Sequence, residues 1–421
     1  MNIVIVGAGP AGVSAAETLR ARDARVSITM ISREPFPPYS PPLMAEYLLH
    51  GGDVIFWRGR DFTERLNIRY LSPRTVVRVL PEQKKLLFAN GEQLGYDRLI
   101  ITTGSTLYAP IRTNIRQPHS QGPAGGFHHF KSLSAAQHIQ KEIQSGRVKT
   151  AVVVGAGFIG TEIAITLNQL GVQVTLVERE NRVMPRMLDA DSSRLAQQFL
   201  EQMGIRILLN TEGVEFFGEH FAEGLLLKSG EALTADLMIA ATGVRPNVDF
   251  LKQSGFETHW GLLVNDYLQT NFPEVYAAGD CVEVPDRITG DRYVHAIYPN
   301  AVEQGQIAAR NALGEQVQYE GAYNMNSLKH LGIPIMAIGT VEGEETLSYW
   351  DGKEVLKKIY LTRGRITGVR LVGDIKNAGV YFSLMMRGTN VESMKPYLLT
   401  RYFNLASLME NARLSSFPFF G

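Results

Sequence analysis

Cysteine is almost absent from this chain, because Cys281 is the only one among 421 residues. A disulfide within the chain is therefore impossible. The chain alone also cannot supply a four-cysteine zinc site or hold an iron–sulfur cluster. We accordingly predict no metal site, and such sparse use of cysteine is typical of a protein of the reducing cytoplasm.

An excess of one charge is also lacking, and so are long apolar runs. Lys and Arg number 42 against 42 Asp and Glu, and basic runs are absent, so no overall field attracts nucleic acid. No apolar run reaches the roughly 18 residues of a membrane span. The N-terminus shows no basic segment followed by a cleavable apolar one. We predict a cytoplasmic protein without a nucleic-acid partner or a membrane span.

What the chain does contain is a repeat at the scale of a domain. Each copy runs from an apolar strand through a glycine-rich turn and a helix to a second strand. A meander then leads to a strand that ends in Thr-Gly. The copies begin near residues 2 and 150, and a Gly-, Pro-, Gln- and His-rich stretch over 113–130 is predicted to link them. This order predicts an α/β protein, followed by a C-terminal α/β unit with helices over 375–387 and 391–409.

The first glycine turn, Gly7-Ala8-Gly9-Pro10-Ala11-Gly12, follows a strand and opens a helix, which is the context of a dinucleotide-binding turn. The three glycines allow the tight turn, the close approach of a pyrophosphate and the packing of helix on strand. The helix N-terminus offers free N–H groups to the pyrophosphate. A carboxylate about 20 residues further on is expected to bind a ribose. Glu34, two residues beyond the strand end at Ser32, is the nearest one.

The second turn, Gly155-Ala156-Gly157-Phe158-Ile159-Gly160, repeats this arrangement. Its following strand, 172–177, ends in Glu178, whose carboxylate is expected to accept both ribose hydroxyls and to repel a 2′-phosphate. NAD is therefore favoured over NADP, although Arg179 follows directly and would soften that preference. A single such turn can be purely structural, but two in the same context favour two nucleotide sites.

Five motifs in order make residues 1–320 resemble the flavoproteins with two dinucleotide-binding domains. This family comprises pyridine nucleotide–disulfide reductases, NADH oxidases and ferredoxin or rubredoxin reductases. The motifs are the two glycine turns, Tyr96-Asp97…Thr102-Thr103-Gly104-Ser105, Ala241-Thr242-Gly243-Val244-Arg245-Pro246-Asn247 and Thr270…Val275-Tyr276-Ala277-Ala278-Gly279-Asp280. The resemblance implies two Rossmann-like domains, with FAD on the first turn and NAD(H) on the second. It predicts an FAD-binding domain over 1–112 and 245–320, an NAD-binding domain over 113–244 and a C-terminal interface domain over 321–421.

The same resemblance implies residue roles at the flavin. Asp280 would bind the ribityl chain of FAD, with Gly279 keeping the backbone close. The helix that begins at Tyr298-Pro299-Asn300-Ala301 would point its positive end at the flavin. Crossovers between the FAD and NAD domains would lie at the two Thr-Gly segments, which contain Thr103, Gly104 and Gly243.

At the nicotinamide, the resemblance implies one catalytic candidate, Glu162, which lies one turn into the second helix and would face the stacked nicotinamide and flavin rings. Phe158 or Ile159 would flank the nicotinamide. Cys281 is expected to be a packed core residue, because it follows a buried strand and matches no redox position of the family.

The segment PPYSPPLMAEY, residues 37–47, departs from the family at the place of its redox thiol. Members that reduce disulfides or peroxide carry a cysteine at the position that matches Pro42, and proline has no nucleophile. Ferredoxin reductases show Arg-Pro-Pro-Leu-Ser-Lys, of which only Pro41-Pro42-Leu43 survives. We therefore expect no thiol chemistry. The segment is predicted to form a stiff wall beside the flavin at Pro42, with Leu43 and Met44 packing near the ring.

The C-terminal stretch 365–379 suggests which branch of the family is closest. It resembles the flavoprotein part of assimilatory nitrite reductases and the NADH-linked FAD subunit of phenylglyoxylate dehydrogenase. That resemblance implies a subunit that exchanges hydride between NAD(H) and FAD, and single electrons with iron–sulfur clusters on partner subunits. Two alternatives stay open: a free-standing NADH oxidase or rubredoxin/ferredoxin-type reductase, and a non-catalytic flavin-binding scaffold. The scaffold is disfavoured by the presence of Glu162 and Glu178.

Overall fold

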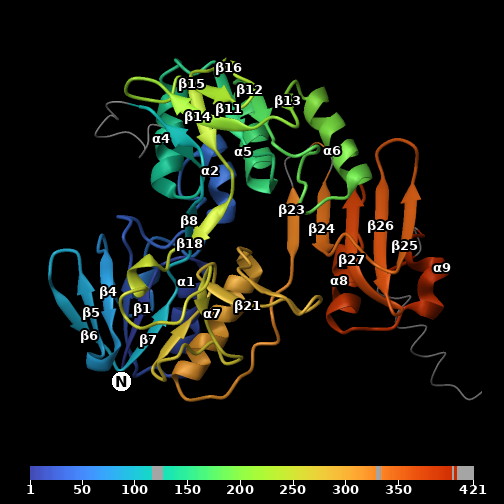
Figure 1. Ribbon diagram of the computed structural model, residues 1–421. Helices are drawn as coiled ribbons and strands as arrows, with labels where there is room; N and C mark the ends of the chain where they lie inside the picture. Colours follow the sequence, from blue (N-terminus) through green and yellow to red (C-terminus); the bar gives the residue numbers. More distant parts are fainter. Residues whose placement is uncertain (116–126, 329–331, 333, 401–402, 405–421) are drawn as a thin grey trace, which may run out of the picture.

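The computed structural model describes residues 1–115, 127–328, 332, 334–400 and 403–404 (Figure 1). Its first sheet has five parallel strands in the order β20-β7-β1-β2-β3. The strands are β20 (Val275–Ala277), β7 (Arg98–Ile101), β1 (Asn2–Val6), β2 (Ser27–Ile31) and β3 (Ile68–Leu71). Most residues of β20, β7, β1 and β2 are buried, which suits strands covered on both faces, whereas the edge strand β3 buries only Ile68. Helices α1 (Pro10–Arg22) and α7 (Tyr298–Ala312) pack against each other beside it.

The second sheet repeats this plan above the first (Figure 1). Its parallel order is β10-β17-β11-β12-β13. The strands are β10 (His128–His129), β17 (Leu237–Ala240), β11 (Thr150–Val154), β12 (Gln173–Val177) and β13 (Arg206–Leu208). Its helices are α4 (Leu133–Gln144), α5 (Phe158–Gln169) and α6 (Ala190–Gln202). The predicted α/β class with two Rossmann-like units is confirmed, because each unit has a parallel sheet with a glycine turn between its first strand and helix.

Shorter elements connect the two units. A two-stranded antiparallel crossover joins β8 (Ser105–Leu107) and β18 (Val244–Pro246). A helical segment, η1 (Pro41–Leu43) followed by α2 (Met44–His50), leaves the first unit and packs on α4 and α5 of the second. The remaining short elements are α3 (Phe62–Arg65), β4 (Val76–Leu80), η2 (Pro81–Gln83), β5 (Lys85–Phe88), β6 (Gln93–Gly95), β9 (Arg112–Thr113), β14 (Gly213–Phe217), β15 (Gly224–Leu227), β16 (Ala232–Thr234), η3 (Asp249–Leu251), β19 (Leu262–Leu263), β21 (Val282–Pro285) and β22 (Arg292–Tyr293).

The C-terminal unit is an antiparallel sheet in the order β23-β24-β27-β26-β25, at the right of Figure 1. Its strands are β23 (Met325–Leu328), β24 (Ile335–Gly339), β25 (Glu345–Trp350), β26 (Leu356–Thr362) and β27 (Arg365–Val372). Helix α8 (Ala378–Met386), η4 (Glu392–Met394) and α9 (Lys395–Leu398) follow. Lys358 on β26 ties this unit to the second one, because its Nζ lies 2.7 Å from Asp189 and 2.6 Å from Asp191 at the start of α6.

Two local predictions differ from the structure. The stretch 113–130 is not wholly a linker, because Thr113 ends strand β9 and residues 128–129 form β10 of the second sheet; residues 116–126 lie outside the described chain. The helix over 391–409 is wrong in its described part, where only η4 and the single turn α9 are helical. The domain boundaries stay predictions.

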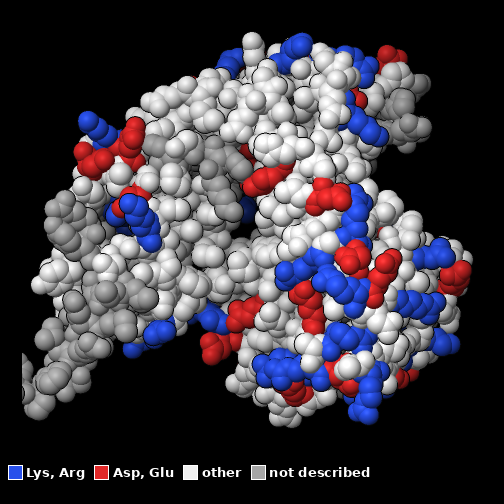
Figure 2. All heavy atoms as spheres, turned by 180° about the vertical axis from the view of Figure 1, so that it is seen from behind, with Lys and Arg blue, Asp and Glu red and all other residues white. Residues whose placement is uncertain are grey.

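The surface agrees with the balanced composition. Figure 2 shows basic and acidic side chains interspersed on the face seen from behind. Many are paired, such as Arg60 with Asp53 at 2.7 Å and Lys84 with Glu274 at 2.7 Å. None of the helices within the described ranges is long and apolar enough to cross a membrane.

Candidate functional site

A cavity of about 950 Å³ lies where the three units meet. The carboxyl ends of β1, β2 and β7 line it, together with the first turns of α1, α5 and α7, the segment η1–α2 and strand β23. A ligand site outside the carboxyl ends of parallel strands is the rule for open α/β sheets. Of the predicted site residues, the cavity brings together Gly7, Gly9, Pro10, Ala11, Glu34, Pro42, Thr103, Gly104, Phe158, Ile159, Glu162, Gly279, Asp280, Pro299 and Ala301.

Other predicted site residues do not line this cavity. Gly12 lies behind the first turn against Gly7 and Thr102. Of the two residues expected to pack near the flavin ring, Met44 lines the cavity, whereas Leu43 packs against the core of the second unit instead. The residues of the second nucleotide site also lie elsewhere, and their roles stay predictions; they are Gly155, Gly157, Gly160, Glu178 and Gly243.

The start of α1 offers the space that a dinucleotide pyrophosphate needs. Gly9 is the N-cap residue, and no side chain of the described residues caps this end. A Cβ built at Gly9 would meet no atom within 4 Å, so the backbone here is open to the cavity. The free N–H groups and positive end of a 13-residue helix therefore face an open space, which fits an anionic pyrophosphate. Gly157 at the start of α5 is equally open.

Asp280 lies at the cavity wall with two partners from distant parts of the chain. Its Oδ2 accepts a hydrogen bond from Ser105 Oγ at 2.7 Å and pairs with Lys131 Nζ at 3.0 Å. The Asp280 and Lys131 side chains are only 18% and 26% exposed. Lys131 also lines the cavity, and sequence reasoning missed it because it directly follows the supposed linker. The arrangement places one anionic and one cationic group where a polyol chain and a phosphate can be held.

Glu34 reaches the cavity although it lies beyond the end of β2. Its carboxylate accepts hydrogen bonds from Tyr39 Oη at 2.6 Å and Ser134 Oγ at 3.3 Å. Burial, followed by the charge of Glu34, holds the pKa of Tyr39 well above its usual value, so the phenol stays a donor to the carboxylate. Glu34 is therefore held in place by α4 and the segment before η1, and its lone pairs remain available for ribose hydroxyls.

The far end of the cavity is built from α5, α2 and α7. Phe158, Ile159 and Glu162 lie on the first turns of α5, and Glu46 lines the same cavity from α2. Ile159 is 45% exposed, an unusual value for an isoleucine on a helix that packs against a sheet. Exposed apolar surface next to a carboxylate suits a planar ring that must be stacked and oriented.

At the second glycine turn, the Glu178 carboxylate accepts hydrogen bonds from backbone N–H groups. Its two carboxylate oxygens accept the N–H of Ala156 at 2.8 Å and that of Glu180 at 3.0 Å. The residue is 7% exposed, and this carboxylate braces the glycine turn from the end of β12. A carboxylate has about four lone-pair positions, so acceptance of ribose hydroxyls remains compatible with these two bonds.

The described residues that line the cavity include no thiol. Pro42 lines it at the position where the family resemblance places a redox cysteine. Cys281 is fully buried, and its Sγ donates to Ala278 O at 3.3 Å. Burial raises its pKa to about 11, so the thiolate is not formed near neutral pH. Among the described residues, no cluster of His, Cys, Asp and Glu is arranged to hold a metal ion.

Comparison with known proteins agrees with this geometry. Residues 1–305 match the family model described as pyridine nucleotide-disulphide oxidoreductase. The chain is 30% identical to an NADH oxidase of Methanocaldococcus jannaschii, over 89% of this chain and 88% of that protein. It is 29% identical to the NADH-dependent phenylglyoxylate dehydrogenase subunit epsilon of Aromatoleum evansii, over 93% of both chains.

Two further similarities bear on length and fold. The chain is 32% identical to a nitrite reductase [NAD(P)H] of Bacillus subtilis, but it spans only 48% of that protein. The structure superimposes on a NAD-dependent persulfide reductase from A. fulgidus with a TM-score of 0.86. The superposition covers 99% of this chain and 84% of the other at 24% identity, which shows the shared fold.

Proposed function

Because the chain belongs to the pyridine nucleotide–disulphide oxidoreductase family, and is therefore an oxidoreductase that uses FAD and NAD(H), we propose that it is the NADH-linked electron-transfer subunit of a larger assembly. In this proposal it exchanges hydride between NAD(H) and FAD, and single electrons with iron–sulfur clusters on partner subunits. A phenylglyoxylate (2-oxoacid) dehydrogenase is the model for such an assembly, because its subunit epsilon matches the chain over nearly its whole length.

The observation that carries the proposal is a dinucleotide cavity without a thiol. Pro42 lines the cavity, and the single cysteine is buried with a raised pKa. Disulfide or peroxide reduction through a cysteine therefore has no nucleophile within the chain. Electrons that leave the flavin therefore pass directly to NAD⁺, to oxygen or to a cofactor that the chain itself does not hold.

The residues of the cavity fit FAD at the first glycine turn. The open backbone at Gly9 and the start of α1 would hold its pyrophosphate, and Glu34 its adenosine ribose. Asp280 and Lys131 would hold the ribityl chain and a phosphate. When bound, FAD supplies the chemistry that converts between hydride transfer and single-electron transfer.

The chain's own part at the reacting end is orientation. Phe158 and Ile159 would stack beside the nicotinamide, and the Glu162 carboxylate would fix its carboxamide edge. The positive end of α7, at Tyr298, Pro299 and Ala301, lines the cavity and would stabilise negative charge that builds up there. With the rings in place, the apolar walls at this end would also exclude water from the transfer.

A free-standing NADH oxidase is the second candidate, and the relative from Methanocaldococcus jannaschii favours it. Stopped-flow measurements on the isolated chain separate the two. We expect anaerobic NADH to bleach the flavin rapidly, and oxygen to reoxidise it far more slowly than an iron–sulfur protein acceptor does. Steady turnover of NADH with oxygen at about 10 s⁻¹ or more would favour the oxidase instead. If NADH fails to bleach the flavin, the non-catalytic scaffold is favoured.

A further inference from the structure

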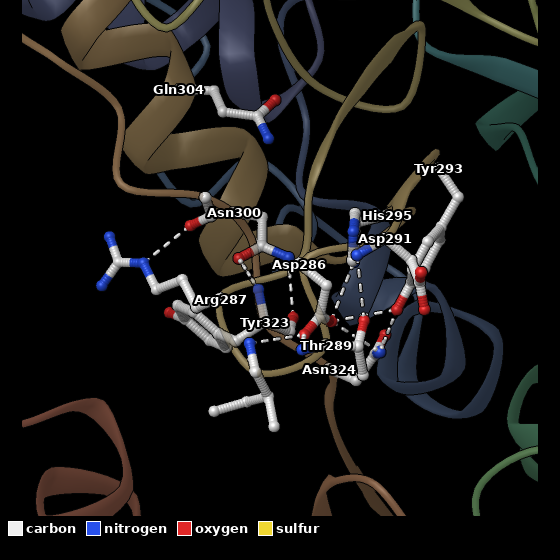
Figure 3. Close-up of polar contacts among 12 residues, drawn as sticks. Asp286, Arg287, Thr289, Asp291, Tyr293, His295, Asn300, Gln304, Tyr323 and Asn324 are labelled. Atoms are coloured by element: carbon white, nitrogen blue, oxygen red, sulfur yellow. Dashed lines mark hydrogen bonds and ion pairs between the residues drawn. The ribbon is translucent and has the colours of Figure 1, made fainter. Parts of the chain in front are cut away.

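Helix α7 carries two buried amide side chains, Asn300 and Gln304, one helical turn apart on the same face (Figure 3). They are 0% and 1% exposed. Neither side chain lines the cavity. Gln304 is hydrogen-bonded to Gly279, which lines it, and Asn300 is hydrogen-bonded to Tyr323, which leads into the lining strand β23. Buried amides are costly unless both ends are bonded, so their contacts show what they hold.

Gln304 holds the turn that presents Asp280. Its Oε1 accepts the N–H of Gly279 at 2.7 Å, and its Nε2 donates to Tyr319 Oη at 3.1 Å. The Gly279 N–H can only donate, so it fixes the amide oxygen toward Gly279 and leaves the NH2 group for the hydroxyl of Tyr319, which is 4% exposed. The turn is tightly enclosed, because Gly279 has φ +85° and a Cβ there would lie 3.1 Å from Ala11 Cβ.

Asn300 holds the entry to strand β23. Its Nδ2 donates to Tyr323 O at 2.8 Å, and its Oδ1 accepts the Tyr323 N–H at 3.3 Å. Two residues later the chain enters β23, whose four residues line the cavity. The intervening Asn324 donates through Nδ2 to Asp286 Oδ2 at 3.2 Å, so the entry is anchored on both sides (Figure 3).

We propose that Gln304 and Asn300 are positioning residues that fix the Gly279–Asp280 turn and the start of β23 to α7, and so set how tightly FAD is held. The first turn of α7 itself lines the cavity, so these bonds join two lining segments, the Gly279–Asp280 turn and the start of β23, to a third one. The proposal rests on FAD as the cofactor and not on the identity of the electron acceptor. Its failure and that of the proposed function are therefore seen in different measurements.

The test compares Gln304→Met with Asn311→Leu. Asn311 is a matched control, because it is a third buried amide on α7, 3% exposed, and bonds to Tyr267 O and Val317 O at 2.8 Å, away from the cavity. The first readout is the FAD dissociation constant of the flavin-free protein. The second is amide hydrogen exchange of the peptide that contains Gly279 in the flavin-free protein, which needs neither cofactor nor turnover.

Gln304→Met removes the hydrogen bonds to both Gly279 and Tyr319. We expect it to raise the FAD dissociation constant by about tenfold or more, the size of one lost buried hydrogen bond at the Gly279 turn, and to speed exchange at Gly279. Asn311→Leu should lower the melting temperature comparably but leave both readouts unchanged. Asn300→Leu should speed exchange at residues 323–328 and spare Gly279. Equal changes in FAD affinity and Gly279 exchange for Gln304→Met and Asn311→Leu would overturn the proposal.

Tyr319→Phe provides a milder variant if Gln304→Met does not fold. It removes one hydroxyl and leaves the bond from Gly279 to Gln304 Oε1 possible. We expect FAD affinity to fall by about threefold, in the same direction as for Gln304→Met. Unchanged affinity together with unchanged exchange at Gly279 would contradict the role assigned to the amide.

Discussion

Replacement of Glu178 by Ala tests whether NAD(H) binds at the second glycine turn while FAD binds separately in the cavity at the first glycine turn. The Glu178 carboxylate accepts the N–H of Ala156 at 2.8 Å and that of Glu180 at 3.0 Å, and the residue is 7% exposed. It does not line the cavity at the first glycine turn. The variant should therefore weaken NADH binding without releasing FAD.

The size of the effect follows from the bonds that are lost. A hydrogen bond to a charged group contributes about 1.5–3 kcal/mol, so losing the acceptor of the ribose hydroxyls should weaken NADH by about 10- to 100-fold. The buried N–H of Ala156 and the partly buried N–H of Glu180 also lose their acceptor. The free energy of unfolding should fall by about 1–3 kcal/mol for this reason.

The assay is an anaerobic titration of the flavin-loaded protein with NADH, with bound FAD measured by its absorbance. Glu180→Ala is the control, since it keeps the backbone N–H and removes only a half-exposed carboxylate paired with Arg179 at 3.2 Å. We expect that control to bind NADH normally. Loss of FAD from Glu178→Ala, with NADH binding unchanged, would refute the assignment of the two sites.

Three further predictions concern single residues. Glu162→Gln should slow anaerobic reduction of the flavin by NADH about tenfold or more, with FAD content unchanged; an unchanged rate would remove Glu162 from the catalytic role. Lys131→Met removes the cationic partner of Asp280 and keeps the hydrogen bond from Ser105, and should weaken FAD about tenfold, which a titration of flavin-free protein checks. Burial lowers the pKa of His128 from 6.5 to about 4, so the unfolded state binds the extra proton between these values. Stability should therefore fall by up to about 3 kcal/mol as the pH drops from 6.5 to 4, and His128→Gln should flatten that dependence in acid unfolding curves.

The sequence was most informative where a site is formed by residues that lie close together in the chain. A strand, a glycine turn and a helix follow one another within about 20 residues, so the pattern alone assigns Gly7 and Gly9 to a nucleotide site, and the ordered motifs add Asp280 to it. The family resemblance, rather than a local pattern, matched Pro42 to the position of the redox cysteine. The cavity collects all four of these residues.

The features of the structure that the sequence did not reveal depend on contacts between segments far apart in the chain. Lys131 meets Asp280 across 149 residues, and the composition before it suggested only a linker. Strand β10 has two residues and gains its partners only in the second sheet, so no periodic pattern could reveal it. The bracing role of Glu178 and the anchoring by Gln304 likewise arise from backbone N–H groups, which the sequence does not mark.

The composition of the natively purified assembly tests the central claim most directly. Native mass and iron content should be measured together on the complex isolated through this chain without denaturation. We predict a mass well above that of the single 46.7 kDa chain, with partner subunits that carry iron in a fixed ratio to FAD. A chain that purifies alone, free of iron, and that turns over NADH rapidly with oxygen would contradict the account.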